Sequence, residues 1–229
     1  MCIKSAHCAR KSPSVDRRQL PLGKIRLKPY ARFLTSASEV LAMSPNAHQP
    51  SVEALSPALE GDHWIEPLRD GTRVLIRPLR EQDRGLEEAF IRELSSEAKR
   101  YRFLGDFKEP DKRMVDRLMH VDYEHDMAFV ALAHDNGRLR EVGISRYSAT
   151  GDGRQCECAI TVADDWRHRG LAVLLMRHLI EVARKHHFKR MFSIDDNTNE
   201  PMRELAGFLG FACESNPGDP RTVVYSLPL

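Results

Sequence analysis

The sequence predicts an α+β (mixed α/β) fold for residues 66–229, preceded by a segment that does not fold. Three observations lead to this prediction. Short runs of alternating apolar and polar residues are typical of strands. Runs with apolar residues three and four apart, typical of helices, lie between them. Neither pattern is sustained in residues 1–62, and the 229-residue chain, 41% hydrophobic and 30% charged, is long enough for one globular domain plus an extra segment.

Residues 1–62 are rich in Pro, Ser, Ala, His and basic residues and lack periodicity, so we expect a disordered N-terminal extension. Before Glu39 its basic residues are opposed only by Asp16, a charge bias found in organellar transit peptides. The composition favours a second interpretation, in which translation begins at Met43. Both interpretations remain open.

The bulk composition argues against several classes of protein. A formal net charge of +2 does not call for nucleic acid or an acidic membrane as a partner. Five cysteines, an odd number, argue against a disulfide scaffold and favour the reducing cytoplasm. The chain has neither an apolar run of about 18 residues nor a signal-peptide core. We therefore expect a soluble cytoplasmic protein, either a monomer or a homodimer.

The first half of the domain is predicted to contain one strand and three helices. Alternation over 73–79 indicates the first strand, at an edge of the sheet. Asp83 is positioned to cap a helix that runs to Leu94. Ser95 starts a second short helix, and a third follows Asp111.

The second half alternates strands and helices. Two strands, over 127–133 and 142–148, are joined by a turn at 134–137 whose Asp-Asn-Gly residues indicate a hairpin. After it we expect a strand, a helix, a strand, a helix and two short strands. The first four of these are predicted over 156–163, 171–186, 189–194 and 200–209.

The loop from Arg167 to Ala172, between a strand and an amphipathic helix, predicts a phosphate site. A helix N-terminus presents unpaired N–H groups and a partial positive charge, and Gly170 lets the backbone approach an anion closely. Arg167, His168 and Arg169 add cationic donors. The loop motifs for nucleoside triphosphates and dinucleotides do not occur. Taken alone, the loop is also consistent with a solvated turn, so its context decides.

That context resembles the GNAT superfamily of N-acetyltransferases over residues 66–229. The superfamily signature is a strand, the loop Arg/Gln-x-x-Gly-x-Gly/Ala, a helix, a second strand, and a last helix running from an Asn to a Gly-Phe pair. These parts correspond to 160–162, the loop 167–172, Asn199 and Gly210-Phe211. The resemblance implies a mostly antiparallel sheet that is splayed between two parallel strands and flanked by helices on both faces.

The resemblance also implies acetyl-CoA as co-substrate, lying where the two parallel strands splay apart. Its pantetheine would contact the backbone of the first strand, and its pyrophosphate would bind the loop. Asn199 would be a further contact, and it is also a good N-cap for the helix that follows. The implied cofactor-binding residues are Ile160, Thr161, Val162, Arg167, His168, Arg169, Gly170, Leu171, Ala172 and Asn199.

Glu157 is the candidate general base. An amine must lose its proton before it attacks a thioester, and a lysine side chain is mostly an ammonium ion at pH 7. Alternation places Glu157 with Ala159 and Thr161 on one face of the strand, and an acid on a central strand is unusual. Because burying an unpaired carboxylate is costly, the position favours catalysis; a structural ion pair with an arginine is the alternative.

Five segments carry a closer resemblance, to bacterial protein lysine acetyltransferases of the Pat type. They are 68–71, 76–79, 101–103, 122–123 and 157–159. This resemblance implies a protein lysine as acceptor, on targets such as acyl-CoA synthetases. It also assigns the base to Glu157.

Ala206 departs from the superfamily pattern. Many members carry a tyrosine there to protonate the CoA thiolate, and Pat-type sequences share its absence. The thiolate would then leave unaided or take its proton through water, as suits a thiol pKa near 8.5. Two alternatives to protein lysine acetylation remain: acetylation of a small-molecule amine, and non-catalytic sensing of acyl-CoA.

Three polar clusters carry weaker signals, and no metal site is expected. Cys156 and Cys158 are interpreted as buried apolar thiols rather than a metal half-site. The histidines at 178 and 186–187 are assigned no chemistry. The acidic residues Asp195, Asp196 and Glu200 would suit a basic substrate or form a solvated loop.

Overall fold

A computed structural model describes residues 63–104 and 109–229. The predicted disordered extension, with Met43, lies outside these ranges. The strands are β1 (Trp64–Pro67), β2 (Arg73–Pro78), β3 (Asp126–Asp135), β4 (Arg138–Thr150), β5 (Gln155–Val162), β6 (Arg190–Asp196), β7 (Ala212–Ser215) and β8 (Thr222–Pro228). The α-helices are α1 (Arg84–Glu93), α2 (Ser96–Phe103), α3 (Lys112–Met119), α4 (Leu171–Lys185) and α5 (Glu200–Leu209). Two short 3-10 helices span Glu81–Asp83 and Asp164–Trp166.

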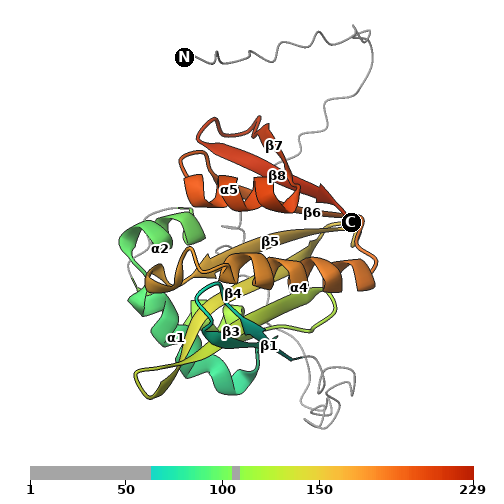
Figure 1. Cartoon of the computed structure of the whole chain (residues 1–229). Coiled ribbons are helices and arrows are strands. Elements are labelled where there is room, and N and C mark those ends of the chain that lie inside the picture. The colour runs from blue at the N-terminus through green and yellow to red at the C-terminus, as the bar shows by residue number, and fades with distance from the viewer. Residues whose placement is uncertain (1–62, 105–108) are drawn as a thin grey trace, which may run out of the picture.

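The strands form one sheet in the order β1-β2-β3-β4-β5-β6-β8-β7 (Figure 1). Every neighbouring pair is antiparallel except β5 and β6, which confirms the predicted mixed fold. The prediction that 73–79 forms the edge was wrong, because β1 pairs with β2 outside it. Trp64 anchors this extra strand by stacking on His178, with ring centroids 4.0 Å apart, and by packing against Phe129.

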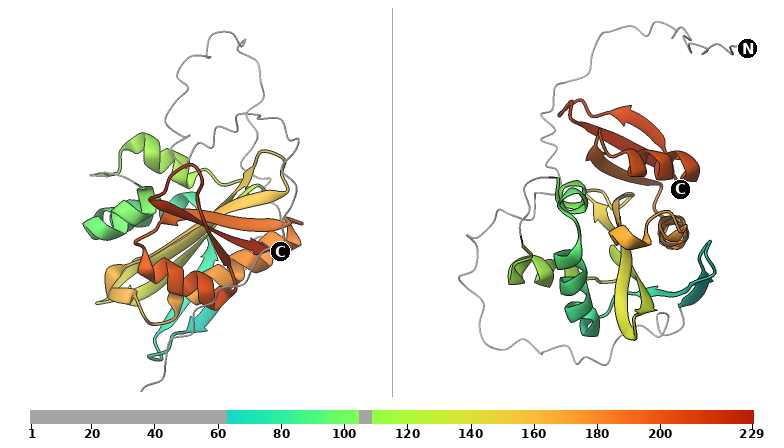
Figure 2. Two further views of the ribbon diagram at one scale, coloured as in Figure 1. Left: turned by 90° about the horizontal axis from the view of Figure 1, so that it is seen from above. Right: turned by 60° about the vertical axis from the view of Figure 1, so that its left-hand side comes forward.

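Helices cover both faces of the sheet (Figure 2). The amphipathic helix α4 packs on one face, and its apolar residues Leu171, Leu175 and Leu179 are buried as predicted. Helices α1 to α3 lie on the other face (Figure 2). Gly143 in β4 lets α4 approach closely, since a Cβ there would stand 3.1 Å from Leu175 Cδ1. A larger side chain at this position would force the helix away from the sheet.

The hairpin between β3 and β4 is tighter than predicted. Both strands extend by two or more residues, and only Asn136 and Gly137 remain in the turn. Their φ angles of 51° and 79° are those that a two-residue turn between right-twisted strands requires.

Three of the four expected helix caps form as predicted. The side chains of Ser95, Asp111 and Asn199 each accept a hydrogen bond from a backbone amide in the first turn of their helix. Asp83 stands at the N-cap position of α1 but does not cap it. The Arg77 guanidinium instead donates two hydrogen bonds to the Asp83 carboxylate, at 2.6 and 2.7 Å. Asp83 is only 2% exposed, and a buried carboxylate is costly unless it is paired with a cation.

The parallel pair β5 and β6 is joined over only part of its length. The paired residues are Gln155 with Arg190, Cys156 with Met191 and Glu157 with Phe192. Beyond Glu157 the two strands separate, because β5 continues along β4 while β6 continues along β8. This splay is the feature that positions the site. None of the helices in the described ranges is long and apolar enough to cross a lipid bilayer.

Candidate active site

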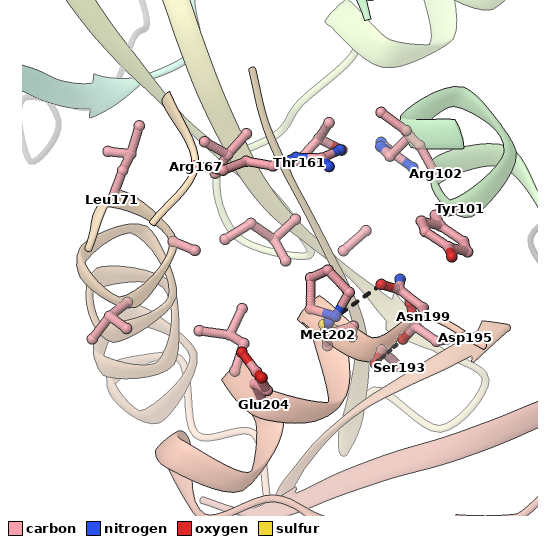
Figure 3. A pocket seen from close by; sticks show the side chains of 18 of the residues that line it. Tyr101, Arg102, Thr161, Arg167, Leu171, Ser193, Asp195, Asn199, Met202 and Glu204 are labelled. Carbon is pink, nitrogen blue, oxygen red and sulfur yellow. Dashed lines mark hydrogen bonds between the residues drawn. The ribbon is translucent and has the colours of Figure 1, made fainter. Parts of the chain in front are cut away.

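A cavity of about 400 Å³ opens where β5 and β6 separate, a volume typical of small-molecule sites (Figure 3). It is lined by residues of β5 and β6 and by parts of α2, α4 and α5. Arg167 and Leu171 lie on one side of it, and Tyr101, Asn199 and Asp195 lie on the other (Figure 3). Of the predicted site residues, all except Arg169 line this cavity.

The open edge of β5 forms one wall of the cavity. Ile160, Thr161 and Val162 keep their pairing with β4, but their edge toward β6 has no strand partner among the described residues. Backbone N–H and C=O groups on such an edge are free to bind an extended ligand that adds itself like a strand. Burial also departs from simple alternation here: Thr161 is buried, while Ile160 and Val162 are only partly buried, since they face the cavity.

Thr161 carries a second sign of a missing partner. Its side chain is 8% exposed, and its Oγ1 forms no hydrogen bond with any described residue. Buried hydroxyls are normally hydrogen-bonded, and leaving one unpaired costs free energy. The Thr161 hydroxyl is thus an enclosed polar atom beside the open strand edge.

The loop Arg167–Ala172 has the backbone of an anion site. His168 and Gly170 have φ angles of 62° and 90°, so the chain turns sharply into α4. Gly170 is the N-cap and has no side chain to occupy the first amides of the helix. The first backbone bond from within the helix is donated by Leu174 to the Gly170 carbonyl oxygen, at 3.3 Å. The amides before Leu174 are therefore available to an anion, and the helix dipole favours one.

The two arginines of the loop differ in their surroundings. Arg167 lines the cavity and pairs with Asp164 at 2.7 Å. Arg169 points away from the cavity: it donates to Asp70 at 3.1 Å and to the Asp165 carbonyl oxygen at 2.9 Å, and it stacks on Trp166. In this structure these contacts of Arg169 hold the loop, and its contact with the cofactor stays a prediction.

Arg69 is a cavity residue that sequence reasoning missed. Its side chain lies against Gly170, 3.6 Å from where a Cβ would stand, and its backbone amide donates to the Arg169 carbonyl oxygen at 3.1 Å. Arg69 therefore lines the cavity next to the start of α4. A hundred residues separate Arg69 from the loop in sequence, and only its place in the segment 68–71 that resembles Pat-type enzymes marked it.

Glu157 lies at the point where the strands separate and lines the cavity. Burial is the main cause that raises the pKa of Glu157 to about 7, the Asp195 carboxylate raises it further, and Arg102 opposes both. A base whose pKa lies near the working pH is well matched to taking a proton from an amine. The alternative prediction was an ion pair between Glu157 and an arginine. Within the described ranges Glu157 forms no salt bridge.

Asn199 combines two features. Its Oδ1 accepts a hydrogen bond from the Met202 amide at 3.2 Å, which confirms the predicted capping role. The same side chain lines the cavity, so a cap and a ligand contact are geometrically compatible (Figure 3).

Of the three acidic residues predicted near the end of β6, one lines the cavity and two do not. Asp195 lines it, whereas Asp196 and Glu200 do not. Ser193 Oγ donates a hydrogen bond of 2.7 Å to Asp195 Oδ2. Asp196 instead accepts from the Thr198 amide at 2.8 Å and stabilises the turn before α5.

The remaining candidates serve the fold. Ala206 is 1% exposed and does not reach the cavity. Cys156 and Cys158 are buried as predicted, and burial raises the pKa of the Cys156 thiol to about 12. His178 bonds Glu66 at 3.0 Å, and His186 bonds the Tyr147 hydroxyl at 2.7 Å.

Comparison with known proteins gives concordant results. A family profile described as the acetyltransferase (GNAT) family matches residues 89–211. A curated acetyltransferase from Pseudomonas aeruginosa is 50% identical over 184 residues, which are 80% of this chain and 99% of that protein. The crystal structure of the GNAT domain of S. lividans PAT superposes with a TM-score of 0.67 at 24% identity and covers 73% of this chain and 97% of its own. A cAMP-binding acyltransferase from Mycobacterium smegmatis gives a TM-score of 0.51 at 21% identity, over 73% of this chain and 47% of that one. At these identities the two solved structures establish the shared fold.

Proposed function

The chain belongs to the acetyltransferase (GNAT) family and is an acetyl-CoA-dependent N-acetyltransferase, and from this premise we propose that its acceptor is a lysine side chain of a protein and that Glu157 is its general base. The observation that carries the proposal is the position of Glu157: a carboxylate with a pKa of about 7, at the point where the cavity opens between β5 and β6. The lysine acceptor rests on the segments that resemble Pat-type enzymes.

The cavity fits acetyl-CoA at three places. The open edge at Ile160 to Val162 suits the pantetheine, whose amides hydrogen-bond like a peptide strand. The first amides of α4, with Arg69 and Arg167, suit the pyrophosphate. Asn199 lies within the same cavity as a further polar contact. Arg167 would then exchange part of its pairing with Asp164 for the phosphate.

Glu157 performs the proton transfer that the acceptor requires. A lysine ammonium gives one proton to the Glu157 carboxylate, and the neutral nitrogen attacks the thioester that acetyl-CoA supplies. The new C–N bond forms as the C–S bond breaks, and the second proton leaves the nitrogen. Because Ala206 has no proton to donate, the second proton passes to water, and the thiolate takes a proton through water or leaves unprotonated.

Acetyl transfer to a small amine is the second candidate, since the cavity identifies the donor more clearly than the acceptor. Labelled acetyl-CoA offered to acyl-CoA synthetases and to a panel of polyamines and amino acids separates the two by mass spectrometry. Acetyl-lysine on a protein, lost in Glu157→Gln, supports the proposal. Label found only on small amines favours the second candidate, and binding of acetyl-CoA without turnover of any amine favours a non-catalytic sensor.

A further inference from the structure

Asp195 is a second carboxylate in the active-site cavity, and the reaction described above does not use it. It stands on β6 beyond the last residue paired with β5, on the side of the cavity away from Arg167 and Leu171 (Figure 3). Ser193 holds one of its oxygens, Oδ2, by a hydrogen bond of 2.7 Å. The carboxylate is therefore fixed in orientation at the cavity wall, beside Asn199, whose side chain also lowers the pKa of Asp195.

The charges around Asp195 would favour a bound cation. Asp195 and Glu157 form no salt bridge in the described part of the chain, although the Arg102 guanidinium on α2 lowers the pKa of both. Burial and Asp196 raise the pKa of Asp195, while Ser193, Arg102 and Asn199 lower it. A bound ammonium ion would add to Arg102, the one guanidinium that lowers the pKa of both carboxylates among the described residues.

The open edge of β5, with Thr161 on it, belongs to the same cavity as the two acids. Thr161 is buried, and its hydroxyl has no hydrogen-bond partner among the described residues. The two acids are thus part of a cavity with an open strand edge. Surface acids of this chain, such as Asp219 paired with Arg221, have no such surroundings.

We propose that Asp195 is a specificity-determining residue that binds the acceptor amine in its ammonium form and presents it to Glu157. The inference rests on the proposed function. The Asp195 carboxylate accepts a charge-assisted hydrogen bond from the ammonium, while a second N–H of the same nitrogen faces Glu157. That N–H bond breaks as the Glu157 O–H bond forms, and the neutral amine then reacts. Asp195 itself neither gains nor loses a proton.

The test compares two acceptors that differ in charge: a lysine peptide, which arrives as an ammonium ion, and hydroxylamine, which is mostly neutral near pH 8. In Asp195→Asn we expect the KM for the peptide to rise about 10-fold or more, as the loss of a charge-assisted hydrogen bond requires, with kcat changed by less than about 3-fold. The KM for hydroxylamine should change by less than about 2-fold. Ser193→Ala, which only frees the carboxylate, should raise the peptide KM by about 2- to 5-fold.

The pH profile gives a second readout that a purely structural role would not move. Removing the Asp195 charge lowers the pKa of Glu157, so the acidic limb of kcat/KM for the peptide should shift to lower pH in Asp195→Asn. Glu214→Gln, which removes an exposed acid from β7 of the same sheet, is the control and should leave both readouts unchanged.

The outcomes separate the two levels of the proposal. Two results with an active wild type would overturn this inference alone. In the first, Asp195→Asn raises the KM equally for both acceptors. In the second, Asp195→Asn changes neither the peptide KM nor the acidic limb of the kcat/KM profile. If Asp195→Asn does not fold, an unchanged peptide KM in Ser193→Ala overturns it in the same way. A wild-type protein that acetylates neither acceptor overturns the proposed function together with the inference.

Discussion

Two pairs of acidic side chains lie within this protein, and their surroundings differ. Glu87 on α1 and Glu141 on β4 are each 1% exposed, and three of their four carboxylate oxygens have no hydrogen-bond donor among the described residues. Burial, followed by the charge of Glu87, raises the pKa of Glu141 well above its ordinary value. Glu157 and Asp195, in contrast, line an open cavity, and the pKa of Glu157 is about 7.

The difference teaches that burial alone does not mark a catalytic carboxylate. Burial is the main cause of the raised pKa of both Glu141 and Glu157. Only the pair at the splay stands beside an open strand edge and an anion-binding helix start, where a substrate has room to meet it. The Glu87–Glu141 pair is a feature of packing between a helix and a strand, with Arg77 and Arg146 as neighbouring cations.

The largest expected effect distinguishes the pairs by activity. Glu157→Gln should lower kcat/KM for a lysine acceptor by about 10²- to 10⁴-fold, the usual contribution of a general base. Wild-type kcat/KM should fall as the pH drops below about 7, since protonated Glu157 cannot act as a base. Steady-state kinetics across pH, with acetyl-CoA affinity from calorimetry, measure both.

Glu141→Gln is the matched control for that experiment. It removes an equally unusual carboxylate that has no contact with the cavity, so kcat/KM should stay within about 3-fold of wild type. The distinction between the pairs collapses if Glu141→Gln is as inactive as Glu157→Gln, or if Glu157→Gln keeps the wild-type rate.

A second prediction concerns the free energy of unfolding, on which Glu157→Gln and Glu141→Gln should act in the same direction. Glu157 has a folded-state pKa of about 7 against an ordinary value of 4.5, so the folded protein loses stability as the pH rises from about 4.5 to 7. Glu157→Gln should therefore raise the free energy of unfolding above pH 7 by at most about 3 kcal/mol, less where solvent reaches the carboxylate, and by almost nothing near pH 4.5. Urea unfolding at both pH values measures this difference.

Glu141→Gln should stabilise in the same direction above the raised pKa of Glu141 while keeping activity. A Glu157→Gln variant that is less stable than wild type near pH 8 would show that the glutamate is held by contacts that favour its charged form.

Much of this architecture follows from local sequence, and the active site only partly does. The hairpin turn at Asn136-Gly137, the caps at Ser95 and Asp111 and the buried face of α4 are set by residues within a few positions of one another, so pattern alone predicts them. The loop Arg167–Ala172 belongs to the same class, because its anion site is made by one helix end.

The parts that escaped prediction depend on contacts between distant segments. Arg69 meets Gly170 across about a hundred residues. The sequence offered Asp195, Asp196 and Glu200 together for a basic substrate, and only Asp195 lines the cavity, because β6 leaves β5 after Glu157. Alternation placed Thr161 on one face of the strand with Glu157 and Ala159, but it could not tell that the edge of β5 beside it is open. The splay between two parallel strands was predicted from the resemblance to a known family, because hydrophobic periodicity carries no information about it.

The smallest expected effect concerns Thr161. Its hydroxyl is unpaired and buried, like the oxygens of Glu87 and Glu141, but it belongs to a residue of the active-site cavity. Thr161→Val removes a buried oxygen that lacks a partner in the free protein, so the free energy of unfolding should rise by up to about 1 kcal/mol. If acetyl-CoA accepts a hydrogen bond from this hydroxyl, the same change should weaken its binding by about 3- to 10-fold, a shift of opposite sign. Thr150→Val, whose hydroxyl already donates to the Gln155 carbonyl oxygen at 3.2 Å, is the control: it should lower stability slightly and leave acetyl-CoA affinity unchanged. Equal acetyl-CoA affinity in wild type and Thr161→Val, measured by calorimetry, would mean that the hydroxyl does not face the ligand and that the open backbone edge alone binds the pantetheine.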